Sequence, residues 1–262
     1  MVFSVIGGDV RQACIARCLE EKGYTVKVFG ENAGLMDCTT GVNAIILPLP
    51  ITSDGVTIKN TDITFDELFE NINKKSIIFG GNIPNIINLK SPCSIIDYYK
   101  SERLKSKNAY LTAEGAIPFI IRGTKKSLKD CKILICGFGR IAKCLAYLLK
   151  PFADDVTVAL RSRKDMALVD ALCFKAADIY SLGSLEEYDV IINTVPARVL
   201  EKEISTVKKD CYILELASAP YGFDIENAKD LNFELGASLP GKISPESAGI
   251  EILNCILRHL KL

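Results

Sequence analysis

Residues 132–142 read Lys-Ile-Leu-Ile-Cys-Gly-Phe-Gly-Arg-Ile-Ala and decide the fold of the second half of the chain. The apolar run before Gly137 predicts a buried strand, and a helix is predicted from Gly139 to Lys150. This glycine spacing is the G-x-G-x-x-A pattern of dinucleotide-binding folds. In that pattern Gly137 permits a tight turn, Gly139 lets a pyrophosphate approach the backbone, and Ala142 lets the helix pack close to the strand. The helix N-terminus offers free N–H groups to the phosphates.

The residues after the next strand indicate which dinucleotide is bound. A strand is predicted over 156–160, and it runs into Arg161-Ser162-Arg163. An NAD-binding protein would carry Asp or Glu at this place, to bind the ribose hydroxyls. Two guanidinium groups and a hydroxyl suit a 2′-phosphate instead, so the segment predicts NADP. The alternative is a solvated basic loop.

A third segment is expected to contact the cofactor. The predicted strand 190–192 ends in Asn193-Thr194-Val195-Pro196. In dinucleotide-binding domains such strand ends face the ribose and the nicotinamide, although an ordinary strand ended by proline is the simpler interpretation. The candidate cofactor-binding residues are therefore Gly137, Phe138, Gly139, Arg140, Ile141, Arg161, Ser162, Arg163, Asn193, Thr194, Val195 and Pro196.

The first half of the chain predicts a second parallel sheet. A strand over 2–6 is followed by the loop Gly7-Gly8-Asp9, a helix to about Glu21 and another strand. Strands and helices alternate in this way to about residue 96, which indicates a flavodoxin-like sheet. Arg11 follows the first strand, at the edge where α/β proteins bind ligands, but a solvated helix residue is an equal alternative.

These patterns predict an α/β protein with two doubly wound domains. The charged segment 100–108 is the expected boundary. We expect an N-terminal flavodoxin-like substrate domain over residues 1–105 and a Rossmann dinucleotide-binding domain over 106–262. A closing C-terminal helix is expected from Glu246 to about Leu260. Because one face of this helix is apolar, it must pack on the sheet or on the other domain.

Composition excludes several classes of protein. The 262 residues carry 32 basic and 32 acidic side chains, which argues against a strongly basic nucleic-acid surface. The apolar runs are shorter than the roughly 20 residues of a membrane span, and a strand that starts at Val2 leaves no room for a signal peptide. Ten cysteines without a C-x-x-C pair, and a single histidine, predict neither a metal site nor disulfides. A reducing cytoplasm fits this cysteine usage.

Short segments in the correct order along the whole chain resemble the A-subunit of dipicolinate synthase of spore-forming bacteria. They are Gly7-Gly8-Asp9-Val10-Arg11-Gln12, Thr112-Ala113-Glu114-Gly115, Gly137-Phe138-Gly139-Arg140, Asn193-Thr194-Val195-Pro196, Leu216-Ala217-Ser218 with Asp224, and Leu239-Pro240-Gly241 with Pro245 and Ala248-Gly249. The sequence departs from the family at Val10, where alanine is usual. It also departs at 221–223, where Tyr-Gly-Phe replaces Gly-Gly-Thr in a loop expected near the nicotinamide.

The resemblance implies an NADP-linked oxidoreductase of sporulation. Its reaction would be the oxidation of dihydrodipicolinate, or of its hydrated precursor, to dipicolinate in the cytoplasm of the mother cell. The partner that it implies is the flavoprotein-like B-subunit of dipicolinate synthase, and we also expect a homo-oligomer. Aromatisation of the ring supplies much of the driving force, so the protein has mainly to orient the ring and hold two carboxylates.

Candidate residues for the substrate come from both halves of the chain. The expected substrate-binding residues are Gly8, Arg11, Ser218, Gly241 and Lys242. Asp9, Glu114 and Lys242 are the candidates for catalysis, although a loop aspartate or a glutamate at a helix start is more often structural. We expect the strand ends of both domains to meet at one cleft.

Two other functions stay open at this point. A shikimate- or methylene-folate-type dehydrogenase shares two α/β domains, but it would be expected to show a clearer catalytic lysine in the first domain. Lys22 and Lys27 fall on a predicted helix end and a strand. The absence of a clear catalytic base also allows a cofactor-binding subunit whose chemistry takes place on a partner.

Overall fold

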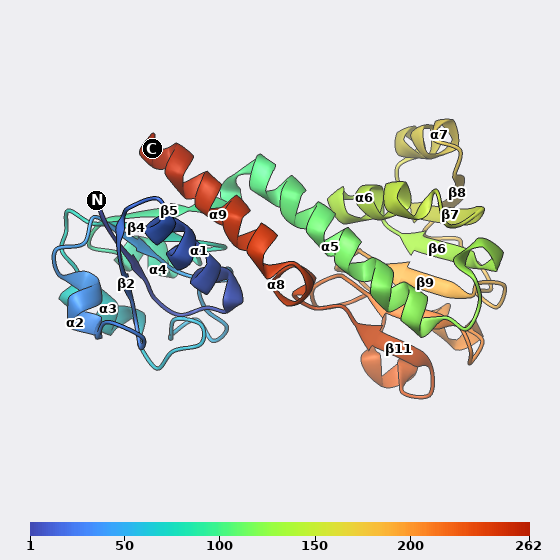
Figure 1. The fold of residues 1–262 in the computed structure, drawn as a ribbon. Coiled ribbons are helices and arrows are strands. Elements are labelled where there is room, and N and C mark those ends of the chain that lie inside the picture. The colour runs from blue at the N-terminus through green and yellow to red at the C-terminus, as the bar shows by residue number, and fades with distance from the viewer. The chain divides into compact units, whose positions relative to one another are not determined.

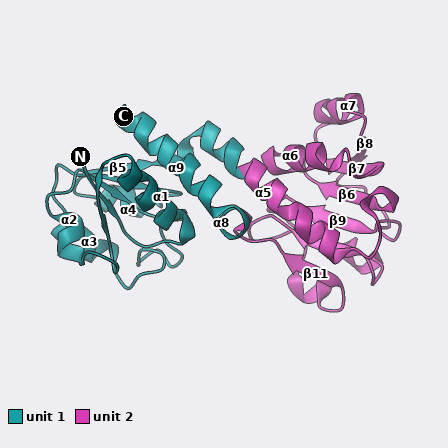
Figure 2. Ribbon diagram, in the orientation of Figure 1, with its two compact units in different colours: residues 1–108, 240–262 teal, residues 109–239 magenta.

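The computed structural model describes residues 1–262. The chain folds into two units, one formed by residues 1–108 with 240–262 and the other by residues 109–239 (Figure 2). Helix α5 (Glu102–Gly123) crosses from the first unit to the second, and the short helix α8 (Leu239–Ile243) marks the return.

Unit 1 is built on a five-stranded parallel sheet with the order β2-β1-β3-β4-β5. Strands β2, β4 and β5 of this sheet are labelled in Figure 1. The strands are β1 (Val2–Val5), β2 (Thr25–Val28), β3 (Ala44–Ile46), β4 (Ile77–Gly80) and β5 (Ser94–Asp97). This order is that of the flavodoxin-like folds, as the sequence predicts.

Alternation of side chains along these strands gives unit 1 a core on each face of its sheet. Phe3 and Val5 pack with the apolar residues of α1 (Val10–Glu21) and α9 (Pro245–Leu260). Ile45 and Leu47 point to the other face, in the same cluster as Phe65. That face is covered by α2 (Leu35–Thr39), α3 (Phe65–Asn71) and α4 (Asn85–Lys90), and the one-turn helix η1 (Tyr98–Lys100) precedes α5.

Unit 2 contains a six-stranded parallel sheet with the order β11-β10-β9-β6-β7-β8. Its strands are β6 (Lys132–Cys136), β7 (Asp155–Leu160), β8 (Lys175–Asp178), β9 (Val190–Asn193), β10 (Tyr212–Glu215) and β11 (Asn232–Leu235). Counted from β6, the order is 6-5-4-1-2-3, which is the Rossmann order. The predicted fold class, two doubly wound α/β domains, is therefore confirmed.

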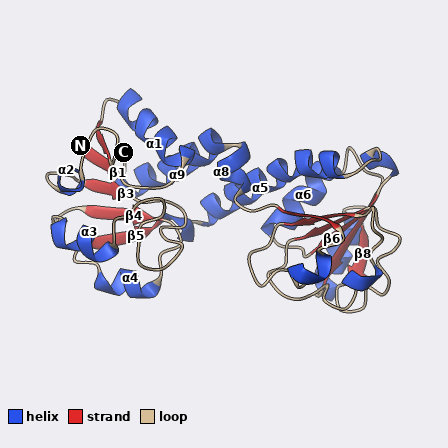
Figure 3. Ribbon diagram, turned by 90° about the horizontal axis from the view of Figure 1, so that it is seen from below, coloured by secondary structure: helices blue, strands red, loops and turns tan.

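Helices cover both faces of the second sheet (Figure 3). On one face Ile133 and Ile135 pack with Ala116 of α5 and Leu145 of α6 (Arg140–Leu149). On the other face Leu134 shares a cluster with residues around the short helices η3 (Ile204–Thr206) and η4 (Ile225–Ala228). Helix α7 (Arg163–Ala171) follows β7, and η2 (Leu128–Asp130) precedes β6.

The C-terminal helix corrects the expected domain limits. Residues 240–262 group with unit 1, not with the dinucleotide-binding unit. The apolar face was expected to consist of Ile250, Leu253 and Leu257. Leu253 and Leu257 lie in the core cluster of β1 and α1, whereas Ile250 is exposed. Of the two packing alternatives, the other domain is the correct one. The cause is close helix packing, because a Cβ at Gly249 would lie 2.7 Å from the carbonyl oxygen of Arg11.

Helix α5 begins within the segment that was expected as the domain boundary. The charged segment 100–108, expected as a boundary loop, already forms its first turns from Glu102. Pro118 lies inside this helix. Charged residues at the start of α5 are solvated helix positions, which composition alone does not distinguish from a linker.

Candidate functional site

The loop between β6 and α6 has the geometry that its glycine pattern predicts. Gly137 has a φ of +101°, and a Cβ there would lie 2.5 Å from the Oγ1 atom of Thr194. Glycine is therefore required both by the backbone conformation and by the close approach of Thr194, which directly follows the neighbouring strand β9. Ala142 is fully buried in the core cluster between α6 and the sheet.

Gly139 has different surroundings from Gly137. It is the N-cap of α6, with an ordinary φ of −77° and no side-chain cap. A Cβ at this position would meet no atom within 4 Å. The folded chain alone therefore does not need glycine here, but a phosphate at the helix N-terminus does need the space.

The N-terminus of α1 differs sharply from that of α6. Asp9 caps α1, and the side chain of Gln12 accepts from the N–H of Asp9, which completes a capping box. Its first turn is thus satisfied by its own side chains. Of these two helix N-termini that follow a glycine loop, α6 is the one left open for an anion.

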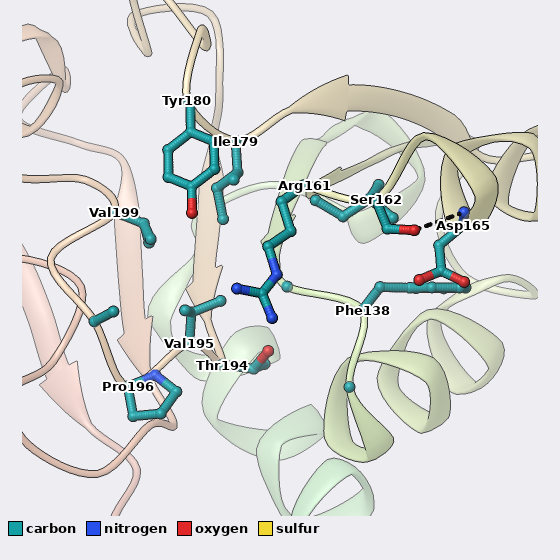
Figure 4. A pocket seen from close by; sticks show the side chains of 14 residues that line it. Phe138, Arg161, Ser162, Asp165, Ile179, Tyr180, Thr194, Val195, Pro196 and Val199 are labelled. Atoms are coloured by element: carbon teal, nitrogen blue, oxygen red, sulfur yellow. Dashed lines mark hydrogen bonds between the residues drawn. The ribbon is translucent and has the colours of Figure 1, made fainter.

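A cavity of about 500 Å³ lies at the carboxyl edge of the second sheet (Figure 4). It is lined by Gly137, Phe138, Gly139, Leu160, Arg161, Ser162, Asp165, Ile179, Tyr180, Thr194, Val195, Pro196, Ala197 and Val199. The structure thus brings together the three segments that the sequence selects for a dinucleotide. Such a crevice at the carboxyl ends of parallel strands is where α/β folds bind their ligands.

Arg161 and Ser162 lie on one wall of this cavity. In Figure 4 the Arg161 guanidinium points into the cavity, toward the segment that follows β9. Ser162 caps α7, and its Oγ accepts from the N–H of Asp165 at 3.2 Å, which leaves the hydroxyl proton free to donate. A cation and a hydroxyl donor are suitable partners for a phosphate.

Four predicted cofactor residues do not line the cavity. Arg163 is the exposed first residue of α7, and Arg140 is the first residue of α6. Ile141 packs against the core, and Asn193 is fully buried at the end of β9.

Several residues in and near the cavity were not predicted from the sequence. Asp165 and Tyr180 line the cavity, although neither belongs to a recognised motif. Glu215, at the end of β10, is 1% exposed and accepts hydrogen bonds from Asn193 and from the N–H groups of Ala217 and Gly222. A charged residue inside the apolar run 212–216 is the signal that would have selected it.

In unit 1 the structure brings Asp9, Arg11 and Gly241 together. Arg11 donates from Nε and Nη2 to the Asp9 carboxylate at 2.8 Å each, and from Nη2 to the carbonyl oxygen of Leu49 at 2.9 Å. A Cβ on Gly241 would lie 3.2 Å from Arg11 Nε, so the backbone packs directly on this pair. Burial alone would raise the pKa of Asp9, but the hydrogen bonds and charge of Arg11 outweigh it and lower that pKa. Asp9 thus has the surroundings of an ionised cap, and its catalytic role stays a prediction.

The remaining substrate and catalytic candidates are more scattered. Gly8 and Asp9 line a second cavity of about 460 Å³ at the edge of the first sheet. Lys242 is exposed on α8. Glu114 is exposed in the interior of α5, so it does not stand at a helix start, and Ser218 is exposed in the loop after β10.

No helix of the structure combines the length and the apolar character needed to cross a lipid bilayer.

Comparisons with known proteins agree with this geometry. Residues 2–94 match the family model described as the N-terminal domain of the dipicolinate synthase A-subunit. The whole chain superposes on the A-subunit of dipicolinate synthase from Bacillus halodurans (22% identity, 98% of that chain, TM-score 0.86). It also superposes on that of Bacillus subtilis (23% identity, 96% of that chain, TM-score 0.83).

More distant similarity extends to dehydrogenases. The whole chain superposes on D-lactate dehydrogenase from Escherichia coli (13% identity, 97% of that chain, TM-score 0.71). A curated relative, shikimate dehydrogenase (NADP(+)) from Clostridium botulinum, is 31% identical over 100 residues, which are 36% of this chain and 39% of that protein. The match therefore spans well under half the length of that relative. A nicotinamide dinucleotide is the cofactor that a dehydrogenase-type Rossmann fold implies.

The predicted resemblance is therefore confirmed: residues 2–94 match the model of the N-terminal domain of the dipicolinate synthase A-subunit, and the chain as a whole has the fold of two solved A-subunits.

Proposed function

We propose that this chain binds NADP in the cavity of unit 2 and takes part in the oxidation of dihydrodipicolinate, or of its hydrated precursor, to dipicolinate. It would act as the A-subunit of dipicolinate synthase, together with a flavoprotein-like B-subunit, in the mother-cell cytoplasm of a sporulating bacterium. The observation that carries the proposal is the cavity at the carboxyl edge of the second sheet. Its walls combine an open helix N-terminus, a guanidinium group and a serine hydroxyl.

Each part of the cofactor has a suitable partner in this cavity. The pyrophosphate fits at the N-terminus of α6, where Gly139 leaves free space and the helix dipole favours an anion. The 2′-phosphate fits beside Arg161, with Ser162 as a second donor. Arg163 is assigned a weaker role than Arg161, because it does not line the cavity.

Substrate binding is proposed for the residues around Arg11. Its guanidinium uses Nε and Nη2 for Asp9 and Leu49, so Nη1 keeps two N–H groups for a substrate carboxylate. Gly8, Ser218, Gly241 and Lys242 remain the other candidates. Removing a hydride and a proton from the dihydropyridine gives the aromatic product. NADP⁺ supplies the hydride acceptor, and Asp9, Glu114 and Lys242 remain the candidates for the proton.

Shikimate oxidation is the second candidate, and the partial identity to shikimate dehydrogenases favours it. A cofactor-binding subunit without its own activity is the third. One assay distinguishes the three candidate functions. The purified chain is incubated with NADP⁺ and either dihydrodipicolinate or shikimate, with and without the B-subunit. We expect NADPH and dipicolinate to form together in equal amounts, and only with dihydrodipicolinate.

Reduction of NADP⁺ with shikimate would favour the second candidate. Binding of NADPH without turnover of either substrate, even when the B-subunit is present, would favour the third. Failure to bind NADPH at all would refute the proposal.

A further inference from the structure

Glu215 is a buried carboxylate without a cationic partner. It lies at the end of β10, directly beside Asn193 of β9 in the parallel register. Its oxygen atoms accept only from amide N–H groups. Oε1 accepts from Asn193 Nδ2 and the N–H of Ala217, both at 2.8 Å, and Oε2 accepts from Asn193 Nδ2 and the N–H of Gly222, both at 2.9 Å. Each carboxylate oxygen thus has two donors.

This network fixes the loop that follows β10. The N–H groups of Ala217 and Gly222 come from the two ends of that loop, so one carboxylate closes it. Gly222 packs closely in the process, since a Cβ there would lie 2.8 Å from Asn193 Nδ2. Phe223 then enters the core, with its ring 5.4 Å from that of Phe233.

The same network reaches the wall of the cofactor cavity by two routes. Asn193 accepts with Oδ1 from the N–H of Val195, and Val195 lines the cavity. Gly222 accepts with its carbonyl oxygen from the N–H of Leu200 at 2.8 Å, next to Val199 of the cavity wall. The orientations of Asn193 and Gly222 therefore set the positions of Val195 and Val199.

We propose that Glu215 is a positioning residue that holds the loop 217–222 and, through Asn193 and Gly222, the wall of the cofactor cavity formed by Val195 and Val199. Burial raises the pKa of Glu215, which opposes this role, but the three donors stabilise the charged form. The inference rests on the proposed function, because the cavity is taken as the cofactor site.

The substitution Glu215→Gln tests the proposal, because it removes the carboxylate while the volume of the side chain stays almost the same. Its amide NH₂ must face the N–H of either Ala217 or Gly222, so at least one hydrogen bond becomes a repulsive contact. We expect NADPH to bind at least tenfold more weakly. Glu215→Asp keeps the carboxylate and should recover at least half of that loss on a logarithmic scale. Glu234→Gln, on β11 of the same sheet and paired with Arg122 and Tyr212, is the matched control and should bind NADPH like the wild type.

Hydrogen exchange of the wild type gives a readout that does not depend on the variants. The N–H groups of Ala217 and Gly222, which donate to the Glu215 carboxylate, should exchange slowly although Ser218 and Ala219 between them are exposed. In Glu215→Gln, exchange should become fast at 194–200 and 216–223, while β6 and β7 stay protected.

Three results would overturn the inference: rapid exchange of the Ala217 and Gly222 N–H groups in the wild type, NADPH affinity of Glu215→Gln within threefold of wild type, or Glu215→Asp no better than the glutamine variant. If the wild type itself fails to bind NADPH, the proposed function fails instead.

Discussion

Gly139→Val is the change that isolates the phosphate site from the fold. A Cβ at this position meets no atom within 4 Å outside the adjacent residues, and the φ of −77° suits any residue. Loss of glycine at a helix N-cap costs on the order of 1 kcal/mol. The variant should therefore fold.

Cofactor binding should nevertheless fail in this variant. The valine methyl groups would fill the space above the N-terminus of α6, where the pyrophosphate is expected to accept from backbone N–H groups. Each charge-assisted hydrogen bond contributes about 1.5–3 kcal/mol. Losing two of them costs about 3–6 kcal/mol, which raises the Kd for NADPH by at least roughly 100-fold.

Titration calorimetry with NADPH, after a check of secondary structure and cooperative unfolding, measures this effect. Gly34→Val is the matched control. Gly34 is also a glycine N-cap, with a φ of −84° and only a 3.7 Å contact for its Cβ, but it lies in unit 1 at α2. A folded Gly139→Val that binds NADPH within threefold of the wild type would refute the assignment of the phosphate site.

Three further substitutions test other features of the molecule. Arg161→Ala should weaken NADPH binding by about 1–3 kcal/mol and NADH binding far less, whereas Arg163→Ala should change either affinity little; equal losses in the two variants, measured by calorimetry, would contradict the assignment of Arg161 alone to the cavity wall. Asp9→Asn should lower the free energy of unfolding at neutral pH by about 1–2 kcal/mol. Because the folded state lowers the pKa of Asp9, this stability is present above the unfolded carboxyl value of about 3.9 and is lost as the pH falls through the folded pKa, so urea titrations of wild type and variant should converge in acid. Gly249→Ala should destabilise the packing of α1 on α9, since overpacking costs about 1–3 kcal/mol against about 1 kcal/mol that alanine gains in a helix; an unchanged or higher urea midpoint would show that the helices move apart freely.

Local patterns were sufficient to predict the fold class and to select three segments that line one cavity. The apolar run before Gly137, the glycine spacing and the basic residues after β7 each act within a few residues of the chain. Parallel strand order then brings their ends to one edge of the sheet, as Thr194 and Val195 show by their approach to Gly137.

The sequence predictions were wrong or incomplete where segments that are far apart along the chain pack together. The apolar face of α9 has no local feature that selects unit 1 over unit 2. Its position follows from the close approach of Gly249 to α1 and from the burial of Leu253 in the core of unit 1. Glu215 was missed because its donors, Asn193 and Gly222, come from separate segments and meet only through the register of β9 and β10. The sequence also does not reveal that Asp9 and Arg11 bind each other, and their roles in catalysis and in substrate binding stay predictions.

Affinity of the purified chain for NADPH and NADH, measured side by side by calorimetry, tests the central claim most directly. Arg161 and Ser162 in the cavity wall predict that NADPH binds at least tenfold more tightly, a difference of about 1.4 kcal/mol that the 2′-phosphate alone supplies. Equal affinities, or tighter binding of NADH, would contradict the proposal that this cavity is an NADP site.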